Sequence, residues 1–371
     1  MEIFPGSDKL ILVDNQNNKK LNLKRHIMKV TIKEIAKEAG VGIATVSRVI
    51  NNSGYVSPET KNKVLETIQK YNYKSTSLVN KIKTDKISIG VFVKGIGNPF
   101  FQKITRNLER EFNMRGCDLA FFDVLYLDEI EFAERTVKLN QFDGAIFLGG
   151  STEYSKEDID RVSCPVLLLT IGASLDISKD LYCSVQVDDE EEGFKATQSL
   201  IDLGHREIGF IYLDNVANDT PNYNRYKGYK KALQENGIRY RESLVAGSNS
   251  VSPEFSTEVN GYRLGFRMMQ ELINNNPNMT AVFAYSDTLA IGVAKCALVS
   301  GRKIPEQMSI IGFDGIDEAE FFHPAIDTVR QPTDVMVSSA ATLLINYING
   351  GGAEHEVLSC NLVRRGSSIR I

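Results

Sequence analysis

From residue 86 to its end, the chain alternates short apolar segments with longer amphipathic ones, and this alternation limits the possible folds more than any other feature. The segments 87–93 and 166–169 have the length and composition of buried strands. Intervening segments such as 99–115 and 189–203 carry apolar residues at helical spacing. Strands separated by helices predict parallel sheets with helices on both faces, so this part of the chain is expected to be an α/β fold.

The alternation is too long for one doubly wound sheet, because about 285 residues follow residue 86. We expect two linked α/β lobes with a cleft at the carboxyl ends of their strands. Lobe 1 should hold residues 86–187 and 333–350, and lobe 2 residues 188–330 and 353–371. The chain should cross between lobes near 186–189, 330–333 and 350–354. Further strands are expected at 117–124, 145–148, 208–213, 281–284 and 309–313, and further helices at 223–236, 261–274 and 288–300.

Residues 28–73 show a different pattern, that of a small all-helical domain. A first helix should end at Gly40, because glycine tolerates the left-handed conformation at a helix C-terminus. A second helix is expected over 43–51. A third should follow Ser57 and Pro58, which suit a helix cap and a first helical position. Two helices joined by a glycine-containing turn and braced by a third predict a helix-turn-helix domain.

Charge separates the N-terminal part from the rest of the chain. Residues 28–86 hold 11 Lys or Arg against 5 Asp or Glu, a net charge of +6, whereas the residues after 86 carry −12. A basic module on an acidic body suits a nucleic-acid binder that contacts phosphate at one end only. Residues 1–27 are expected to be a disordered extension, with Met1 and Met28 both open as the start of translation. Residues 74–85 are expected to be a hinge helix or linker.

Several classes of protein are disfavoured by what the sequence lacks. No apolar run approaches the roughly 20 residues that span a bilayer, and residues 1–27 lack a signal-peptide core, so we expect a cytoplasmic protein with no membrane partner. Five dispersed cysteines and four dispersed histidines predict neither a disulfide scaffold nor a metal site. There is no Walker motif, and the segment Gly95-Ile-Gly97-Asn-Pro lacks the third glycine of a dinucleotide fingerprint. We therefore expect no enzyme activity and no cofactor.

The stretch from Val30 to Tyr55, VTIKEIAKEAGVGIATVSRVINNSGY, resembles the headpiece of the lactose-repressor/galactose-repressor (LacI/GalR) family of bacterial transcriptional regulators. Shorter motifs continue the resemblance in the family's order, among them NPFF at 98–101, LGHREIGFI at 203–211, IGFD at 311–314 and TVRQP at 328–332. The resemblance implies a helix-turn-helix headpiece, a hinge and a two-lobed core similar to periplasmic sugar-binding proteins. Such a protein acts as a homodimeric repressor, here of carbohydrate-utilisation genes.

In this family, the second headpiece helix enters the major groove of operator DNA, a palindromic duplex. Ile43, Ala44 and Arg48 fall at the variable base-contacting positions, and Arg48 can donate two hydrogen bonds to a guanine. Gly42 stands where the family usually has a serine that caps this helix, and glycine is a slightly weaker cap. The other candidates for phosphate or base contact are Thr31, Ile32, Lys33, Thr45, Ser47, Asn51 and Tyr55.

The linker resembles the family's hinge helix, which inserts a leucine into the minor groove at the operator centre. Ile82 stands at that position, and apolar wedges of this kind kink DNA. Ser75 and Thr76 stand where the family often has Pro-Asn. A flexible tether without DNA contact therefore remains an alternative.

The resemblance also implies a small effector, a sugar or sugar derivative, bound between the lobes, and we expect it to act as an inducer. The candidate residues combine a planar guanidinium, carboxylates, aromatic platforms and a crossover amide, a mixture that binds polyols. Asp314 can equally serve only the turn around it. A sugar-transport protein would need an export signal and no headpiece, and a sugar-processing enzyme is a more distant alternative. The candidates are Phe100, Phe101, Arg225, Asp287, Asp314 and Gln331.

Overall fold

The computed structural model describes residues 32–50, 56–57, 60, 63–64, 67, 86–125, 127–150, 154–172, 177–213, 220–247 and 261–371. They belong to two compact units, Met1–Lys83 and Thr84–Ile371, and each unit is described by itself. The predicted extension 1–27 and the predicted hinge 74–85 lie outside the described residues. Within the described residues, no helix is long and apolar enough to cross a membrane.

The first unit contains α1 (Ile32–Ala39) and α2 (Ile43–Ile50), which agree with the first two predicted helices. Gly40 ends α1 with a φ of +65°, a conformation that favours glycine. A third helical segment begins near Ser57, whose hydroxyl accepts a hydrogen bond from the amide of Thr60 at 3.3 Å. The three segments share a small buried core of Ile35, Ala36, Ala39, Val46, Val49 and Val64.

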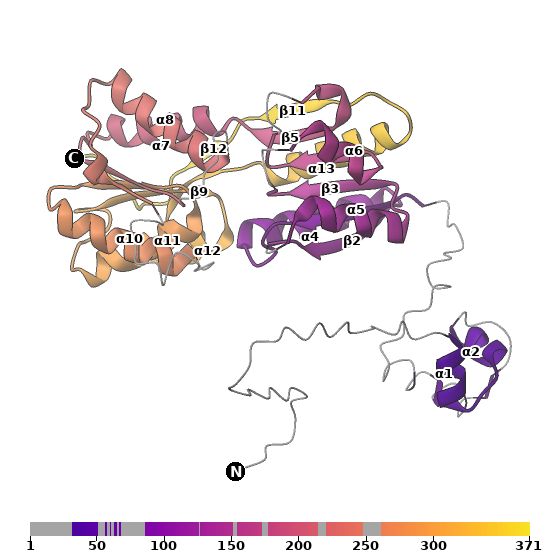
Figure 1. Ribbon diagram of the computed structural model, residues 1–371. Coiled ribbons are helices and arrows are strands. Elements are labelled where there is room, and N and C mark those ends of the chain that lie inside the picture. Colours follow the sequence, from indigo (N-terminus) through magenta and orange to yellow (C-terminus); the bar gives the residue numbers. More distant parts are fainter. Residues whose placement is uncertain are drawn as a thin grey trace, which may run out of the picture. The chain divides into compact units, whose positions relative to one another are not determined.

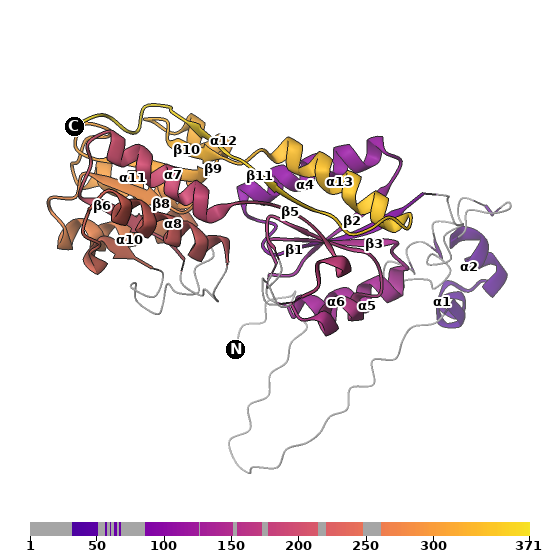
Figure 2. The same ribbon diagram turned by 90° about the horizontal axis from the view of Figure 1, so that it is seen from above.

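The second unit contains two α/β lobes (Figure 1). Lobe 1 is made of β1 (Ser88–Val93), α4 (Pro99–Met114), β2 (Asp118–Asp123), α5 (Glu129–Asn140), β3 (Gly144–Leu148), α6 (Lys156–Val162), β4 (Val166–Leu169), η1 (Lys179–Leu181), β5 (Cys183–Val187), α13 (Thr333–Ile348) and β11 (His355–Leu358). Its six-stranded sheet has the order β11-β5-β4-β3-β1-β2, and every neighbouring pair is parallel. Figure 2 shows α4 and α13 on one face of this sheet and α5 and α6 on the other.

Lobe 2 repeats this architecture. It is made of α7 (Asp189–Asp202), β6 (Ile208–Ile211), α8 (Pro221–Glu235), η2 (Glu242–Leu244), β7 (Val245–Ala246), α10 (Gly261–Asn275), β8 (Ala281–Ala284), α11 (Asp287–Val299), β9 (Ser309–Asp314), α12 (Asp317–Phe321), β10 (Asp327–Arg330) and β12 (Asn361–Val363). Its six-stranded sheet has the order β12-β10-β9-β8-β6-β7, with α7 and α8 on one face and α10 and α11 on the other. Only β12, at the edge, runs antiparallel to its neighbour β10. The predicted class, a two-lobed α/β core with parallel sheets, is confirmed.

Three connections join the lobes. They lie at Asp188 between β5 and α7, at Gln331 and Pro332 between β10 and α13, and at residues 359–360 between β11 and β12. The prediction of a crossover near 350–354 is wrong, because β11 pairs with β5 and so belongs to lobe 1. Strand β11 is a half-exposed edge strand that contains polar residues, so its sequence lacks the apolar run by which a buried strand is predicted.

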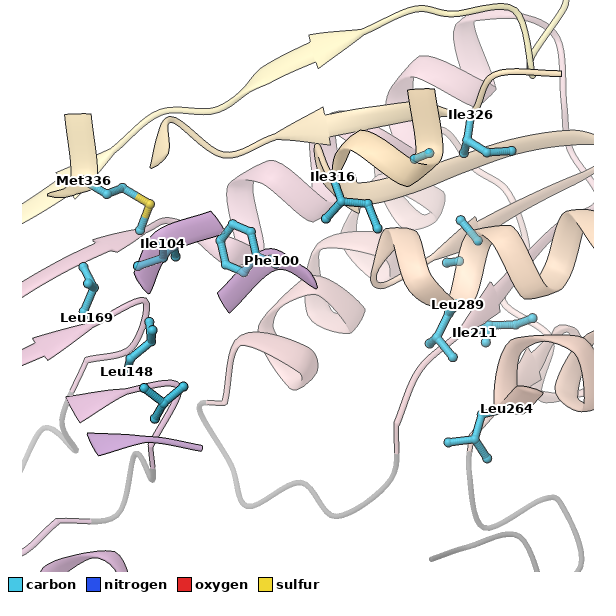
Figure 3. Packing of buried hydrophobic residues seen from close by; sticks show 14 of the residues in the cluster. Phe100, Ile104, Leu148, Leu169, Ile211, Leu264, Leu289, Ile316, Ile326 and Met336 are labelled. Atoms are coloured by element: carbon cyan, nitrogen blue, oxygen red, sulfur yellow. The ribbon is translucent and has the colours of Figure 1, made fainter. Parts of the chain in front are cut away.

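One hydrophobic cluster contains residues of both lobes. Figure 3 shows its labelled members as two groups, with Phe100 of lobe 1 and Ile316 of lobe 2 on the sides that face each other. Lys103 of α4 and Asp317 of α12 add an ion pair between the lobes, with 3.3 Å between Nζ and Oδ1. Side-chain contacts therefore link the two lobes in addition to the three connections.

Helices α7 and α8 of lobe 2 pack so closely that only glycine fits at their contact. A Cβ atom on Gly228 of α8 would lie 2.1 Å from the carbonyl oxygen of Glu190 in α7. A Cβ atom on Gly292 of α11 would lie 2.0 Å from the carbonyl oxygen of Tyr262 in α10. Because the obstructing atoms belong to the backbone, neither can move without displacing its helix. The contact at Gly228 fixes the position of α8, which carries Arg225 one turn before Gly228.

We expect Gly228→Ala to lower the free energy of unfolding of the full chain by about 1–3 kcal/mol, the usual cost of overpacking. In an unobstructed helix the same change raises stability by about 0.5–1 kcal/mol, so the sign of the effect reports the contact. Urea unfolding followed by circular dichroism measures it. Gly352→Ala is the control, because a Cβ atom there would meet nothing within 4 Å. A stabilising effect of Gly228→Ala would contradict the described contact.

Candidate functional site

Helix α2 buries part of its surface and exposes two of the predicted base-contacting residues. Val46 and Val49 of α2 are buried, whereas Arg48 is exposed and Ile43 is 45% exposed. Gly42, just before the helix, is also exposed, and its carbonyl accepts hydrogen bonds from the amides at 45 and 46. A Cβ atom on Gly42 would make only ordinary contact, so the site has room for a serine.

The remaining candidates for DNA contact are described to different extents. Lys33 in α1 is exposed and Thr45 in α2 is half-buried. Ile32 lies at the start of α1, and Ala44 and Ser47 lie within α2, but only their helical backbone is described. Four candidates lie outside the described residues: Thr31, Asn51, Tyr55 and Ile82.

In the core, the carboxyl ends of the strands of both sheets line one cleft. A cavity of about 190 Å³, which we call the Arg225 cavity, lies at these ends. Such strand ends are the usual ligand site of α/β sheets. Its lining comes from both lobes: Asn98, Phe100, Phe101, Gly149, Gly150, Thr170 and Ile171 from lobe 1, and Thr220, Pro221, Asn222, Arg225, Tyr285, Asp314 and Gln331 at or beyond the strands of lobe 2.

Arg225 is the charged centre of this cavity, although only 5% of the residue is exposed. Its Nε donates to Oδ1 of Asp189 at 2.8 Å, and its Nη1 donates to the carbonyl oxygen of Tyr285 at 2.7 Å. The guanidinium lies 3.5 Å from the ring centre of Phe313, and Nη1 is 3.7 Å from Oδ1 of Asp314. Among the described residues Nη2 of Arg225 has no hydrogen-bond acceptor, so this nitrogen could donate to a ligand.

Asp314 ends β9 in an unusual conformation. Its φ is +108°, a value that L-residues rarely adopt and that often marks a binding site. Its Oδ1 accepts a hydrogen bond from Nε2 of Gln331 at 2.9 Å, and Gln331 lies on the second connection between the lobes. Burial raises the pKa of Asp314 to about 6, although Arg225 opposes the shift. Thr170, on the lobe 1 wall of the cavity, also has a positive φ, of +69°.

Asp287, predicted to contact the effector, does not line the cavity. It is fully buried, and its Oδ2 accepts hydrogen bonds from the amides of Gly315 and Ile316 at 2.8 and 2.9 Å. Burial raises its pKa to about 8, with a further increase from the charge of Asp314. The prediction needs correction, because Asp287 starts α11 and points back toward β9 rather than into the cleft. Its task is to hold the turn that positions Asp314.

Phe100 and Phe101 occupy different places, which the sequence left open. Phe100 is 4% exposed and belongs largely to the hydrophobic cluster, although it touches the Arg225 cavity. The ring of Phe101 lies over Gly149, where a Cβ atom would come within 2.3 Å of its Cζ. Phe101 also lines a second, larger cavity. It is therefore the better platform for a sugar ring.

The second cavity, which we call the Lys94 cavity, has a volume of about 650 Å³. It shares Asn98, Phe101, Gly149 and Tyr285 with the Arg225 cavity, so the two are neighbouring parts of one cleft. The rest of its lining comes from strand ends and adjoining turns: Lys94, Gly95, Gly97, Pro99, Asp123, Leu125, Leu213, Gly261, Tyr262, Ser286, Thr288 and Leu289. These residues are not among the candidates predicted from the sequence, although Lys94 and Asp123 each lie at the carboxyl end of a predicted strand.

A third hollow, of about 590 Å³, lies away from the strand ends on α10 and α11. It is lined by aromatic and cationic side chains, and its opposed walls do not come from two lobes. We place the ligand site in the cleft instead, where buried charge and positive φ values converge. Among the described residues, no three His, Cys, Asp or Glu side chains are arranged to hold a metal ion.

Comparison with known proteins gives the same division of the chain. A family model described as bacterial regulatory proteins, lacI family, matches residues 31–75, and one described as periplasmic binding protein-like domain matches residues 197–368. The HTH-type transcriptional regulator MalR of Clostridium butyricum is 33% identical over 347 residues, which cover 92% of this chain and all of MalR.

Two solved structures resemble this fold and hold sugars. One is a complex of the transcriptional regulator CelR with cellobiose, 28% identical, with a TM-score of 0.66 over 91% of this chain and 99% of that one. The other is a LacI family transcriptional regulator from Enterococcus faecium with bound ribose, 26% identical, with a TM-score of 0.64 over 76% of this chain and 99% of that one.

The raised pKa of Asp287 predicts how stability depends on pH. Its carboxyl keeps its proton in the folded chain after the unfolded chain has lost it, so the free energy of unfolding falls as pH rises from about 4 to about 8. Asp314 contributes only to about pH 6, whereas Asp287 contributes to the loss of stability between pH 6 and 8.

We expect Asp287→Asn to reduce the difference between the urea midpoints at pH 6 and pH 8, because asparagine does not titrate. Asp118→Asn is the matched control, since Asp118 is half-exposed at the start of β2 and pairs only loosely with Lys86 at 3.8 Å. The control should keep the wild-type difference. An unchanged difference in Asp287→Asn would contradict the assignment.

Proposed function

The chain belongs to the lacI family of bacterial regulatory proteins, and we propose on this basis that it is a repressor of carbohydrate-utilisation genes controlled by a sugar-like effector. The headpiece binds operator DNA, and the effector binds in the cleft between the lobes. The observation that carries the proposal is the Arg225 cavity, where a buried guanidinium, a carboxylate and an aromatic platform meet at opposed strand ends. The protein acts as a regulator in the cytoplasm, where operator DNA lies, and not as an enzyme.

The chemistry of the cavity suits a polyol. Nη2 of Arg225 and the side-chain amide of Asn98 can donate to hydroxyl oxygens, and Asp314 can accept from hydroxyl groups. The face of Phe101 offers an apolar platform for the C–H face of a sugar ring. We assign effector contact to Phe101, Arg225, Asp314 and Gln331, with Phe100 behind them and Asp287 holding the turn at Asp314.

Closure of the lobes is the conformational change by which we expect effector binding to alter operator binding. A ligand that contacts both lobes binds their closed arrangement best and shifts the population toward it. Asp189 and Gln331, both bonded within the site, adjoin two of the connections between lobes. Closure therefore changes the connections themselves. In a homodimer this rotation alters the separation of the two hinges, and Ile82 then leaves the minor groove, so we expect the effector to be an inducer.

A homodimer needs a surface at which the two subunits meet, and we propose that the third hollow is part of that surface in lobe 2. Aromatic and aliphatic side chains line the hollow together with three cationic side chains. Phe321, which precedes the lining residue Phe322 in the sequence, is 85% exposed. Exposed apolar patches of this kind mark protein–protein contacts. We assign the hollow, lined by Tyr262, Arg263, Phe266, Arg267, Gln270, Ile291, Gly292, Lys295 and Phe322, to the contact between the two subunits.

Operator binding tests the proposal directly. We expect the full chain to shift a palindromic duplex from the region upstream of its own gene, and Arg48→Ala to weaken that binding by about 10–100-fold. The reason is the loss of a bidentate contact to guanine, which contributes about 1–3 kcal/mol. Fluorescence anisotropy at fixed salt measures both affinities.

The matched control is Arg135→Ala, which removes an exposed arginine from α5 of the core. It changes the overall charge by the same amount as Arg48→Ala. It should nevertheless bind the operator like the wild type, because Arg135 lies in the core and not in the headpiece. Equal binding by Arg48→Ala and the wild type would overturn the role of Arg48. Absence of specific binding to any upstream palindrome would overturn the proposed function.

A further inference from the structure

We propose that the effector is an uncharged sugar of at least two rings, with one ring in the Arg225 cavity and the next in the Lys94 cavity. The inference rests on the proposed function, that a sugar binds between the lobes, and it goes further by naming the size and charge of that sugar. Four observations carry it: the volumes of the two cavities, their shared wall, the polar groups beyond that wall, and the balance of charge.

The volumes argue for two rings. The Arg225 cavity, at about 190 Å³, is smaller than the roughly 300 Å³ at which ligand pockets usually begin, so it suits one ring rather than two. The Lys94 cavity, at about 650 Å³, falls within the range of about 300–1,000 Å³ that is usual for ligand pockets. A single ring at Arg225 would leave the larger part of the cleft to water.

The shared wall places the junction between the rings. Asn98, Phe101, Gly149 and Tyr285 line both cavities, and they come from both lobes. Because Gly149 lacks a Cβ atom, the ring of Phe101 lies directly over the end of β3, on the wall that the two cavities share. A glycosidic bond beside this shared wall would set one ring in each cavity.

Beyond the wall, the Lys94 cavity offers groups that match sugar hydroxyls. Oδ1 of Asp123 accepts hydrogen bonds from the amides of Gly95 and Leu125 at 3.3 and 3.2 Å. Among the described residues its Oδ2 has no donor, so that oxygen can accept from a hydroxyl. On the opposite lobe, the hydroxyls of Ser286 and Thr288 lie 3.0 Å apart and can donate or accept.

The balance of charge argues against a phosphorylated sugar. In the Arg225 cavity, the guanidinium is already compensated by Asp189 at 2.8 Å and Asp314 at 3.7 Å. In the Lys94 cavity, Lys94 lies 3.8 Å from Glu129 and shares the lining with Asp123. Each cation of the cleft thus has at least one carboxylate beside it. A phosphate would bring about two more negative charges, and no described residue lining the two cavities offers an unpaired cation to receive them.

The test is calorimetric titration of the full chain with three classes of probe. The first class is the disaccharides maltose, cellobiose, lactose and sucrose, and the second is the monosaccharides glucose, galactose, fructose and ribose. The third is glucose 6-phosphate and trehalose 6-phosphate. We expect one disaccharide to bind at least ten-fold more tightly than either of its own monosaccharides and than both phosphates.

A pair of variants places the second ring. Asp123→Asn removes the charged acceptor from the Lys94 cavity, and we expect it to reduce the ratio of disaccharide to monosaccharide affinity by about five-fold or more. Asp118→Asn, at the other end of the same strand β2, should leave that ratio at its wild-type value. Circular dichroism of both variants checks that each is folded, and the wild-type titrations stand without either variant.

The outcomes are distinct. A monosaccharide that binds as tightly as every disaccharide would overturn the two-ring inference while supporting the proposed function. Tight binding of a sugar phosphate would overturn the inference of an uncharged effector in the same way. An unchanged affinity ratio in Asp123→Asn would overturn the placement of the second ring. If no sugar binds at all, the proposed effector class fails and the inference fails with it.

Discussion

The arrangement of the cleft depends on the ion pairs and hydrogen bonds of the buried Arg225 guanidinium. A charge with so little exposure is tolerated only when carboxylates and hydrogen-bond acceptors surround it. Its partners come from three directions: Asp189 follows the first connection between the lobes, the carbonyl of Tyr285 follows β8, and Asp314 ends β9. The close packing of α8 on α7 through Gly228 holds the arginine at this meeting point. The proposed ligand site and the junction of the lobes therefore share one set of electrostatic contacts.

This sharing explains how a small ligand can act on the whole core. Asp314 contacts Gln331 on the second connection, and Asp287 fixes the turn that follows Asp314. A hydroxyl that competes for Asp314 or Arg225 changes the partners of residues beside two connections at once. The strain at Asp314, with its positive φ, is maintained by these bonds. A ligand hydroxyl can thus replace a polar contact of Asp314 or Arg225, whereas the backbone contact of α8 with α7 at Gly228 does not change.

The sequence predicted most of the buried strands, because their apolar runs are unambiguous, as at 166–169. It did not predict β5, β7, β10, β11 or β12. Polar residues interrupt the apolar runs of β5 and β10, β7 has only two residues, and β11 and β12 are exposed or half-exposed at sheet edges. Phe101, Arg225, Asp314 and Gln331 do line the cleft. Asp287 was predicted to contact the effector, but its neighbours Tyr285 and Ser286 line the cavities instead. Sequence spacing does not show in which direction each side chain points at the start of a helix. Lys94 and Asp123 could have been found by applying the strand-end rule to every strand.

The central claim is that occupation of the cleft changes operator affinity. The most direct measurement is the fluorescence anisotropy of a labelled operator with the full chain, titrated with the best-binding sugar and, separately, with mannitol as a polyol control. The account predicts that the sugar weakens operator binding by about 5–150-fold, the range of typical coupling energies of about 1–3 kcal/mol, and that mannitol has no effect. Operator affinity that stays constant while calorimetry shows the sugar bound would contradict it.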